Sequence, residues 1–339
     1  MMNDTSSNLD GPGGIIDNVT FAFFILVLQL IVSPITAVLA LCAGITNTAI
    51  FARMDLNLGV NINLLILSVS DLAQAVVIVT TNVWFLMLRL DYNDLVGRVT
   101  VSQFLLMIVN YPINVSIAVT AVIAVVRSLS VVMPLTFRTA ASRRRQLLAI
   151  IFCSSLGISI PLYTQISYFV LISKDINNVS QSDFMDAAQL FPALIMVFDI
   201  FRNIFFYSCF VVSTVSMIFL SIALKKSSKF QTSASAATKI SQTKKSSTRD
   251  VQIVKTVILI LAVHFFCNLP LMTFSILRRF FPQLTASGQY RNASDIFTFI
   301  VGISTSLNIF LNTPVYFFCN SRYRMIAFSS FVKSSIVCQ

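Results

Sequence analysis

Long stretches without a single charged residue constrain this chain more than any other feature of its sequence. Six such runs are Asn18–Ala52, Val99–Val126, Gln146–Ser173, Asn203–Leu224, Thr256–Leu277 and Ile296–Ser321, and a seventh, Leu56–Leu88, is broken only by Asp71. As a helix rising 1.5 Å per residue, even Asn203–Leu224 reaches about 33 Å, enough to cross a bilayer core of about 30 Å. The pattern therefore predicts an all-α fold, a bundle of seven transmembrane helices.

The composition also indicates a membrane protein. Hydrophobic residues make up 56% of the chain and charged residues only 11%, whereas soluble proteins carry about 25% charged residues. The runs lack the alternation of polar and apolar residues that the strands of a membrane β-barrel require. We therefore expect an N-terminal tail over residues 1–20, one helical domain over 21–319 and an amphipathic C-terminal segment over 320–339. A flexible cytoplasmic loop, rich in Ser, Thr and Lys, is predicted at 225–250.

The placement of charge predicts which side of the membrane each end of the chain occupies. With the N-terminus outside, 17 of the 24 Lys and Arg residues fall on the cytoplasmic side. The positive-inside rule therefore predicts an extracellular N-terminus and a cytoplasmic C-terminus, in a multi-pass protein of the plasma membrane. Four N-glycosylation sequons lie on the predicted outer side, so the glycosylation candidates are Asn3, Asn18, Asn178 and Asn292.

Short motifs interrupt the apolar runs. They are GITN in the first run, NLLILSVSDL in the second, VVRSLSVVMPL at the end of the third, FCNLP in the sixth and NTPVYFF in the seventh. The residues that carry them are Asn47, Asp71, Arg127, Pro134, Pro270, Pro314 and Tyr316. Together with seven helices and an outer N-terminus, this set resembles the rhodopsin-like (class A) G-protein-coupled receptors over roughly residues 20–333. The resemblance implies a receptor for an extracellular ligand, a heterotrimeric G protein as partner, and a short amphipathic eighth helix after Tyr316.

The resemblance also assigns roles to polar residues inside the bundle. It implies a sodium ion held by four side chains with oxygen atoms, which suit a hard cation: Asp71, Ser116, Asn308 and Asn312. A polar network that holds water and only packs the helices is the alternative for these four residues. Arg127 corresponds to the arginine that faces the G protein on activation. The alternative is a boundary arginine whose guanidinium merely reaches water.

Around Arg127 the chain departs from the family pattern. Val126 stands where the family has an acidic residue, and Ser128 stands where it has a tyrosine. An adjacent carboxylate would hold the arginine in the inactive state through a charge-assisted hydrogen bond. We therefore expect raised basal signalling from this chain.

The sixth and seventh helices depart from the pattern as well. Asn268 replaces a tryptophan two residues before Pro270, and His264 takes the preceding aromatic switch position. We expect His264 and Asn268 to hydrogen-bond across the bundle, and Pro270 to kink the helix. In the seventh helix, Thr313 separates the asparagine of the family motif from its proline, while Tyr316 stays in register. The resemblance implies an activation switch of five residues: Arg127, His264, Asn268, Pro270 and Tyr316.

The chemical class of the ligand is constrained mainly by the residues that the extracellular half of the predicted bundle lacks. The seventh run has no lysine for a retinal Schiff base, and Val99–Val126 has no acid for an amine. A peptide or a small chemosensory molecule is the expected ligand, as in divergent invertebrate chemosensory-like or peptide-receptor-like branches. The candidate polar contacts in the outer half are Asn110, Asn114, Gln165, Asp199 and Arg202.

Other functions and partners stay open at this point. An enzyme is not expected, because the sequence has one histidine and no metal-ligand spacing or nucleophile motif. A non-signalling decoy relative is one alternative, and a membrane transporter subunit is another, although Asp71 is the only deep charge. Arrestin and kinases are further candidate partners, no nucleic-acid partner is expected, and Cys319 is a palmitoylation candidate.

Overall fold

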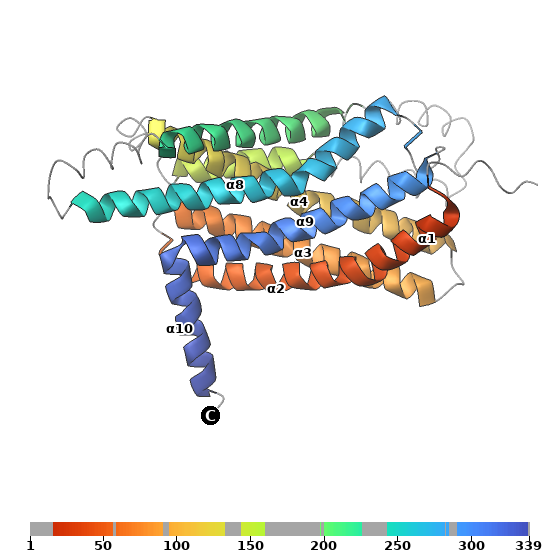
Figure 1. Cartoon of the computed structure of the whole chain (residues 1–339), viewed down its shortest axis with the longest axis horizontal. Coiled ribbons are helices and arrows are strands. Elements are labelled where there is room, and N and C mark those ends of the chain that lie inside the picture. The colour runs from red at the N-terminus through yellow and green to blue at the C-terminus, as the bar shows by residue number, and fades with distance from the viewer. Residues whose placement is uncertain are drawn as a thin grey trace, which may run out of the picture.

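The chain forms long helices that lie side by side (Figure 1). The structure, a computed structural model, describes residues 16–56, 59–90, 95–132, 144–159, 197, 200–225, 243–281, 283–284 and 290–337. The labelled helices are α1 (Asn18–Val27), η1 (Leu28–Val32), α2 (Ser33–Ala52), α3 (Gly59–Leu90), α4 (Leu95–Val132), α8 (Thr243–Phe280), α9 (Arg291–Cys319) and α10 (Ser321–Val337). Residues 144–159 and 200–225 are also helical, and no strand occurs within the described ranges.

Six helices in the described part of the chain are long and apolar enough to cross a membrane. They cover Val19–Ala52, Gly59–Met87, Ile108–Val131, Ile200–Lys225, Val254–Phe280 and Arg291–Cys319. Each overlaps a run that the sequence predicts to span the bilayer. The predicted fourth span is described only over its helical part at 144–159, and its remainder lies outside the described residues.

The first span is one continuous helix with a local irregularity. Asp17 caps its N-terminus, because its carboxylate accepts a hydrogen bond from the Thr20 backbone N–H at 3.1 Å. A π-helical turn, η1, separates α1 from α2, and Pro34 follows at the start of α2. Both features bend helices, and α1 leans away from the line of α2 in Figure 1.

The predicted loop at 225–250 is wrong at its C-terminal end. The α8 helix begins at Thr243, inside that range, and continues without interruption to Phe280. Extending a helix that already exists costs far less than nucleating a new one, so a polar Ser/Lys segment can continue the sixth span as helix. The later part of α8, where Pro270 lies, bends away from the first part (Figure 1), which agrees with the predicted proline kink.

The helices pack through small residues and one main apolar cluster. Gly44 of α2 allows close approach to α3, since a Cβ at this position would lie 3.0 Å from the Leu72 Cα. The largest cluster of buried apolar side chains includes Phe51, Leu67, Leu220, Leu261, Tyr316 and Tyr323. The cluster also includes Val119 of the third span and Ile150 of the fourth, so it joins all seven spans to α10.

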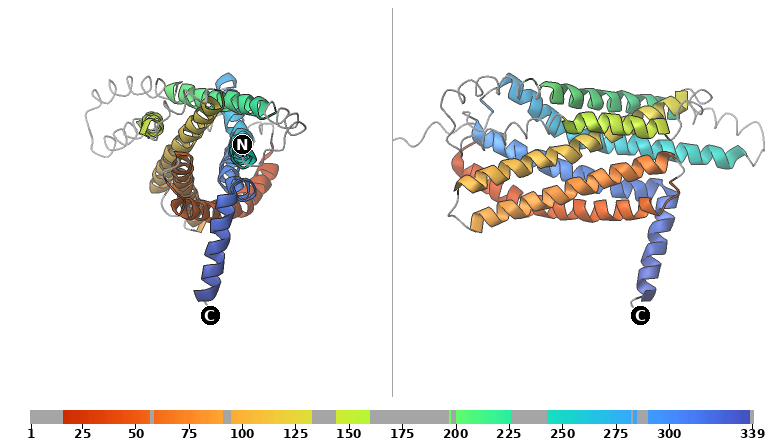
Figure 2. Two further views of the ribbon diagram at one scale, coloured as in Figure 1. Left: turned by 90° about the vertical axis from the view of Figure 1, so that its left-hand side faces the viewer. Right: turned by 180° about the vertical axis from the view of Figure 1, so that it is seen from behind.

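The last helix leaves the direction of the bundle. Asn320 ends α9 and caps α10, because its Oδ1 accepts the backbone N–H groups of Arg322 and Tyr323, each at 3.1 Å. Figures 1 and 2 show α10 running across the direction of the other helices, at the opposite end of the bundle from the start of α1. The sequence predicts an amphipathic eighth helix along the membrane surface; the structure gives the crossing direction of α10, and its membrane contact stays a prediction.

Candidate functional site

Three helices meet at a buried carboxylate. Asp71 of α3 accepts hydrogen bonds from the Ser116 hydroxyl of α4 at 2.8 Å and from the Asn312 side-chain amide of α9 at 3.1 Å. All three side chains are buried. We call Asp71, Ser116 and Asn312 the Asp71 cluster. The sequence predicts these residues to lie together, and the structure brings them together.

Two side-chain amide oxygens, one in this cluster and one a helical turn away from it, have no hydrogen-bond donor in the described part of the chain. Asn308, one turn before Asn312, is buried, and the Oδ1 atoms of both asparagines meet no donor there. Buried amide oxygens of this kind are costly unless water or a cation satisfies them. The donor set of one carboxylate, one hydroxyl and two amide oxygens therefore fits the predicted sodium ion chemically. The structure shows no hydrogen bond between Asn308 and Asp71 themselves.

A second polar group lies between the first span, the seventh span and α10. The Oδ1 atom of Asn47 accepts hydrogen bonds from the Thr313 hydroxyl at 3.1 Å and the Tyr323 hydroxyl at 2.7 Å. We call Asn47, Thr313 and Tyr323 the Asn47 cluster. Burial raises the pKa of Tyr323 to about 12, so its hydroxyl keeps the proton that it donates. Thr313 is the inserted residue that moves the proline of the family motif one position along the helix, and its hydroxyl is hydrogen-bonded to Asn47.

Sequence reasoning missed Tyr323. It follows Tyr316 by seven residues, which would place the two on one face of a continuous helix, but the chain changes direction at Asn320 between them. Both rings instead pack against Phe51 of α2, with centroids 4.8 Å and 5.4 Å from the Phe51 ring. The Tyr316 hydroxyl is buried and has no hydrogen-bond partner in the described part of the chain. Tyr316 is therefore held by its ring alone.

Arg127 lies near the end of α4, where the structure places it partly buried. Its neighbour Val126 packs against the main apolar cluster, so an apolar side chain fills the place of the family's acid. Ser128, in the place of the family's tyrosine, donates a hydrogen bond to the Ser216 carbonyl of the fifth span at 3.4 Å. Pro134, the loop proline of the same motif, lies outside the described residues.

His264 and Asn268 do form a pair, but the hydrogen bonds run along α8 and not across the bundle as predicted. The Asn268 amide lies 3.2 Å from His264 Nδ1 and donates to the His264 carbonyl at 2.8 Å. The two residues are one turn apart on a single helix, so their side chains reach each other before they reach a neighbouring helix. Both are buried.

The candidate ligand contacts are only partly described. Asn114 of α4 donates to the Gly157 carbonyl of the fourth helix at 3.2 Å, so it joins helices. Gln165 and Asp199 lie outside the described residues, as do the sequon residues Asn3 and Asn178 and the side chain of Asn18. Asn292 is described, and its amide donates to the Ile16 carbonyl at 3.2 Å. Glycosylation and palmitoylation stay predictions.

The apolar helices form a bundle with a polar centre. An arginine lies near the end of one span, and one helix crosses the others at one end of the bundle. These features define a multi-pass membrane protein built like a transmembrane receptor. Residues 43–311 match the family model described as 7 transmembrane receptor (rhodopsin family). The chain therefore belongs to the rhodopsin family of seven-transmembrane receptors, and it is a receptor, not an enzyme. No curated protein matches the chain in a sequence search.

Proposed function

We propose that this receptor couples an extracellular peptide or small chemosensory molecule to a heterotrimeric G protein. The observation that carries the proposal is Arg127, near the end of α4 with Val126 in place of an acid. A guanidinium at that end of the bundle offers planar donors to the backbone carbonyls of an entering G-protein segment. The wider family explains the receptor role, and this residue supports the choice of G protein as partner.

Basal activity follows from the same position. In a receptor with an acid beside the arginine, a charge-assisted hydrogen bond favours the inactive state, and signalling must break that bond. Val126 offers no acceptor, so the inactive state loses this stabilisation and the active state gains population without ligand.

Sodium is proposed as an inhibitory ligand of the Asp71 cluster, with Asn308 as a fourth contributor. A bound cation would supply positive charge that neutralises the buried Asp71 carboxylate. If it binds the folded receptor, sodium raises the melting temperature by mass action, whereas the larger choline cation does not. The Asp71→Asn variant removes the negative charge and should abolish that difference, measured by a thermal shift assay in detergent.

The proposed location is the plasma membrane, with the N-terminus outside and the C-terminus inside. The proposal rests on the basic residues of the predicted cytoplasmic loops, including Arg144 and Arg145 at the start of the fourth helix. Epitope tags at each end test it in intact cells. Antibody should reach only the N-terminal tag before permeabilisation, and access to the C-terminal tag would contradict the proposal.

A ligand screen tests the function itself. Cells expressing the receptor with a promiscuous G-protein reporter are exposed to a library of peptides and small volatile or soluble molecules. We expect at least one compound to raise reporter output through the wild-type receptor and not through Arg127→Ala at matched surface expression. Equal responses from both receptors would contradict the assigned role of Arg127.

A non-signalling decoy receptor is the second candidate. The observation that favours it is the loss of three switch side chains at once, with Val126, Ser128 and Asn268 in their places. A decoy would bind a compound from the library, shown by displacement of a labelled analogue, without any reporter response. Binding without signal would therefore replace the first proposal by this one.

A further inference from the structure

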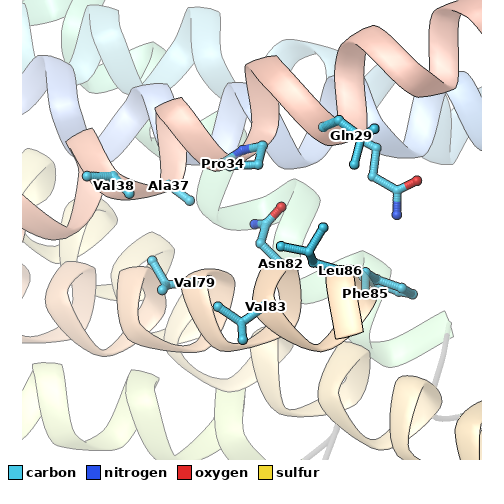
Figure 3. Close-up of a pocket in the computed structure, with 10 residues that line it drawn as sticks. Gln29, Pro34, Ala37, Val38, Val79, Asn82, Val83, Phe85 and Leu86 are labelled. Atoms are coloured by element: carbon cyan, nitrogen blue, oxygen red, sulfur yellow. The ribbon is translucent and has the colours of Figure 1, made fainter. Parts of the chain in front are cut away.

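Two side-chain amides of α3 differ in their hydrogen bonding. Asn82 lies in a cleft between the first span and α3 (Figure 3), where its Oδ1 accepts the Ser33 hydroxyl at 2.7 Å and its NH2 group donates to the Ile78 carbonyl at 2.9 Å. Gln74 is only 2% exposed, yet its side-chain amide forms no hydrogen bond within the described residues. A buried amide without a partner is costly, and folded proteins satisfy nearly all such groups. Gln74 therefore points to a partner from outside the chain.

Asn308 of α9 lies at the same level of the bundle as Gln74. Ala75 of α3 and Ile309 of α9 belong to one small cluster of buried side chains with Ala40 of α2. Gln74 and Asn308 each precede one of these residues by a single position. The Asn308 Oδ1 is buried and meets no donor in the part of the chain that the structure describes. Two unsatisfied amides thus come from different helices at one level.

This level is one helical turn from the Asp71 cluster. Gln74 follows Asp71 by three residues, a rise of about 4.5 Å, and Asn308 precedes Asn312 by four residues, a rise of about 6 Å. Asp71 bonds to Asn312, and the α3 residue four places later packs with the α9 residue three places earlier, so the two helices are antiparallel. Both displacements therefore point to the same side, which is the predicted extracellular side.

Asp71 restricts the charge of the partner. Its two carboxylate oxygens each accept one hydrogen bond, from Ser116 and from Asn312. This carboxylate would repel an anion one turn away, because the surrounding medium has a low dielectric constant. A cation would be attracted past the amides to Asp71 itself, where sodium is proposed. The amides of Gln74 and Asn308 carry no charge, so an uncharged polar group suits them best.

We propose that Gln74 and Asn308 bind an uncharged carboxamide at the inner end of the receptor's ligand. A carboxamide has two N–H donors and a carbonyl acceptor, so it can both donate to and accept from a glutamine or asparagine side chain. A hydroxyl has a single donor and satisfies fewer of these groups. The inference rests on the proposed function, because it takes the partner to be the extracellular ligand.

A thermal shift assay on the purified receptor in detergent tests the inference with benzamide as the probe. Choline chloride replaces sodium chloride, so that sodium does not compete at Asp71. Benzoate and benzylamine serve as the anionic and cationic counterparts. We expect benzamide, and neither counterpart, to raise the melting temperature of the wild type. Gln74→Leu keeps a side chain of similar size without the amide and should reduce the benzamide shift at least threefold.

Asn82→Leu is the matched control. It removes an amide from the same helix at a position where the chain already satisfies that amide. Its benzamide shift should stay within twofold of wild type. Asn308→Leu repeats the test from α9 and should also reduce the shift. A benzamide shift that is absent, that survives both Gln74→Leu and Asn308→Leu, or that benzoate or benzylamine matches would overturn the inference.

The assay contains no G protein, so this inference and the proposed function can fail separately. Benzamide binding that depends on Gln74, in a receptor that never drives nucleotide exchange, would overturn G-protein coupling and leave the amide site standing. A receptor that drives exchange but shows no such binding would overturn the amide site alone.

Discussion

Buried polar side chains occur in this bundle in two different arrangements. Asp71 binds residues 45 and 241 positions away in the sequence, so its hydrogen bonds tie three helices together. The His264–Asn268 pair spans four residues of one helix. Removing the first arrangement releases helices from one another, whereas removing the second leaves the helix packing in place. The number of helices that a polar group joins should therefore decide its effect on stability.

Replacing Asp71 by leucine should have the largest effect. The Asp71→Leu change removes the acceptor for both Ser116 and Asn312 and leaves two buried donors without partners. Hydrogen bonds between membrane helices contribute about 0.6 kcal/mol on average and up to about 1.7 kcal/mol each. We therefore expect a loss of about 1–3 kcal/mol, measured as a lower melting temperature in detergent. Asp71→Asn keeps an acceptor oxygen, so its melting temperature should fall less than that of Asp71→Leu. Equal falls for the two variants would show that these hydrogen bonds do not contribute to stability.

The Tyr323→Phe variant tests a single hydrogen bond between two helices. It removes only the hydroxyl that donates to Asn47 and leaves the ring packed on Phe51. One bond between α10 and the first span is lost, so we expect destabilisation of about 1 kcal/mol and faster amide hydrogen exchange in α10. Tyr207→Phe is the control, because within the described residues no hydrogen bond from that hydroxyl occurs. Unchanged exchange in α10 would mean that the hydroxyl does not anchor the helix.

The smallest effect is expected from the local pair. In the double variant His264→Phe/Asn268→Leu, both partners become apolar side chains of similar size, so neither is left unsatisfied. Such paired replacements are close to neutral. The melting temperature should change by less than the equivalent of about 0.5 kcal/mol. A loss as large as that of Asp71→Leu would contradict the comparison and would indicate that the pair contacts a further helix.

Much of the fold follows from the sequence because lipid leaves few options. Uncharged runs long enough to cross the bilayer must become helices, and the described helices overlap all seven predicted spans. Asp71, Ser116 and Asn312 could be grouped in advance only because the resemblance to the rhodopsin-like receptors implies that they surround one ion. The spans thus follow from the chemistry of the bilayer, whereas the grouping follows from the resemblance.

The remaining features depend on geometry that the sequence does not state. The Tyr323–Asn47 bond requires the chain to turn at Asn320, and the start of α8 at Thr243 requires a polar segment to follow an existing helix. The π-helical turn before Pro34 is equally hidden, because one inserted residue leaves the apolar composition unchanged. The Tyr323–Asn47 bond joins residues 276 positions apart, whereas the other two features are local variations in the course of a helix.

The central claim concerns Arg127 and the missing acid beside it. The most direct measurement is nucleotide exchange on a purified heterotrimeric G protein by the receptor in nanodiscs, without ligand. The account predicts exchange above that of empty nanodiscs for the wild type and at least a threefold fall for Val126→Asp, which restores a carboxylate beside the arginine. Val126→Asn, similar in size but uncharged, should retain most of the basal exchange. Basal exchange that is absent in the wild type, or unchanged in Val126→Asp, would contradict the account.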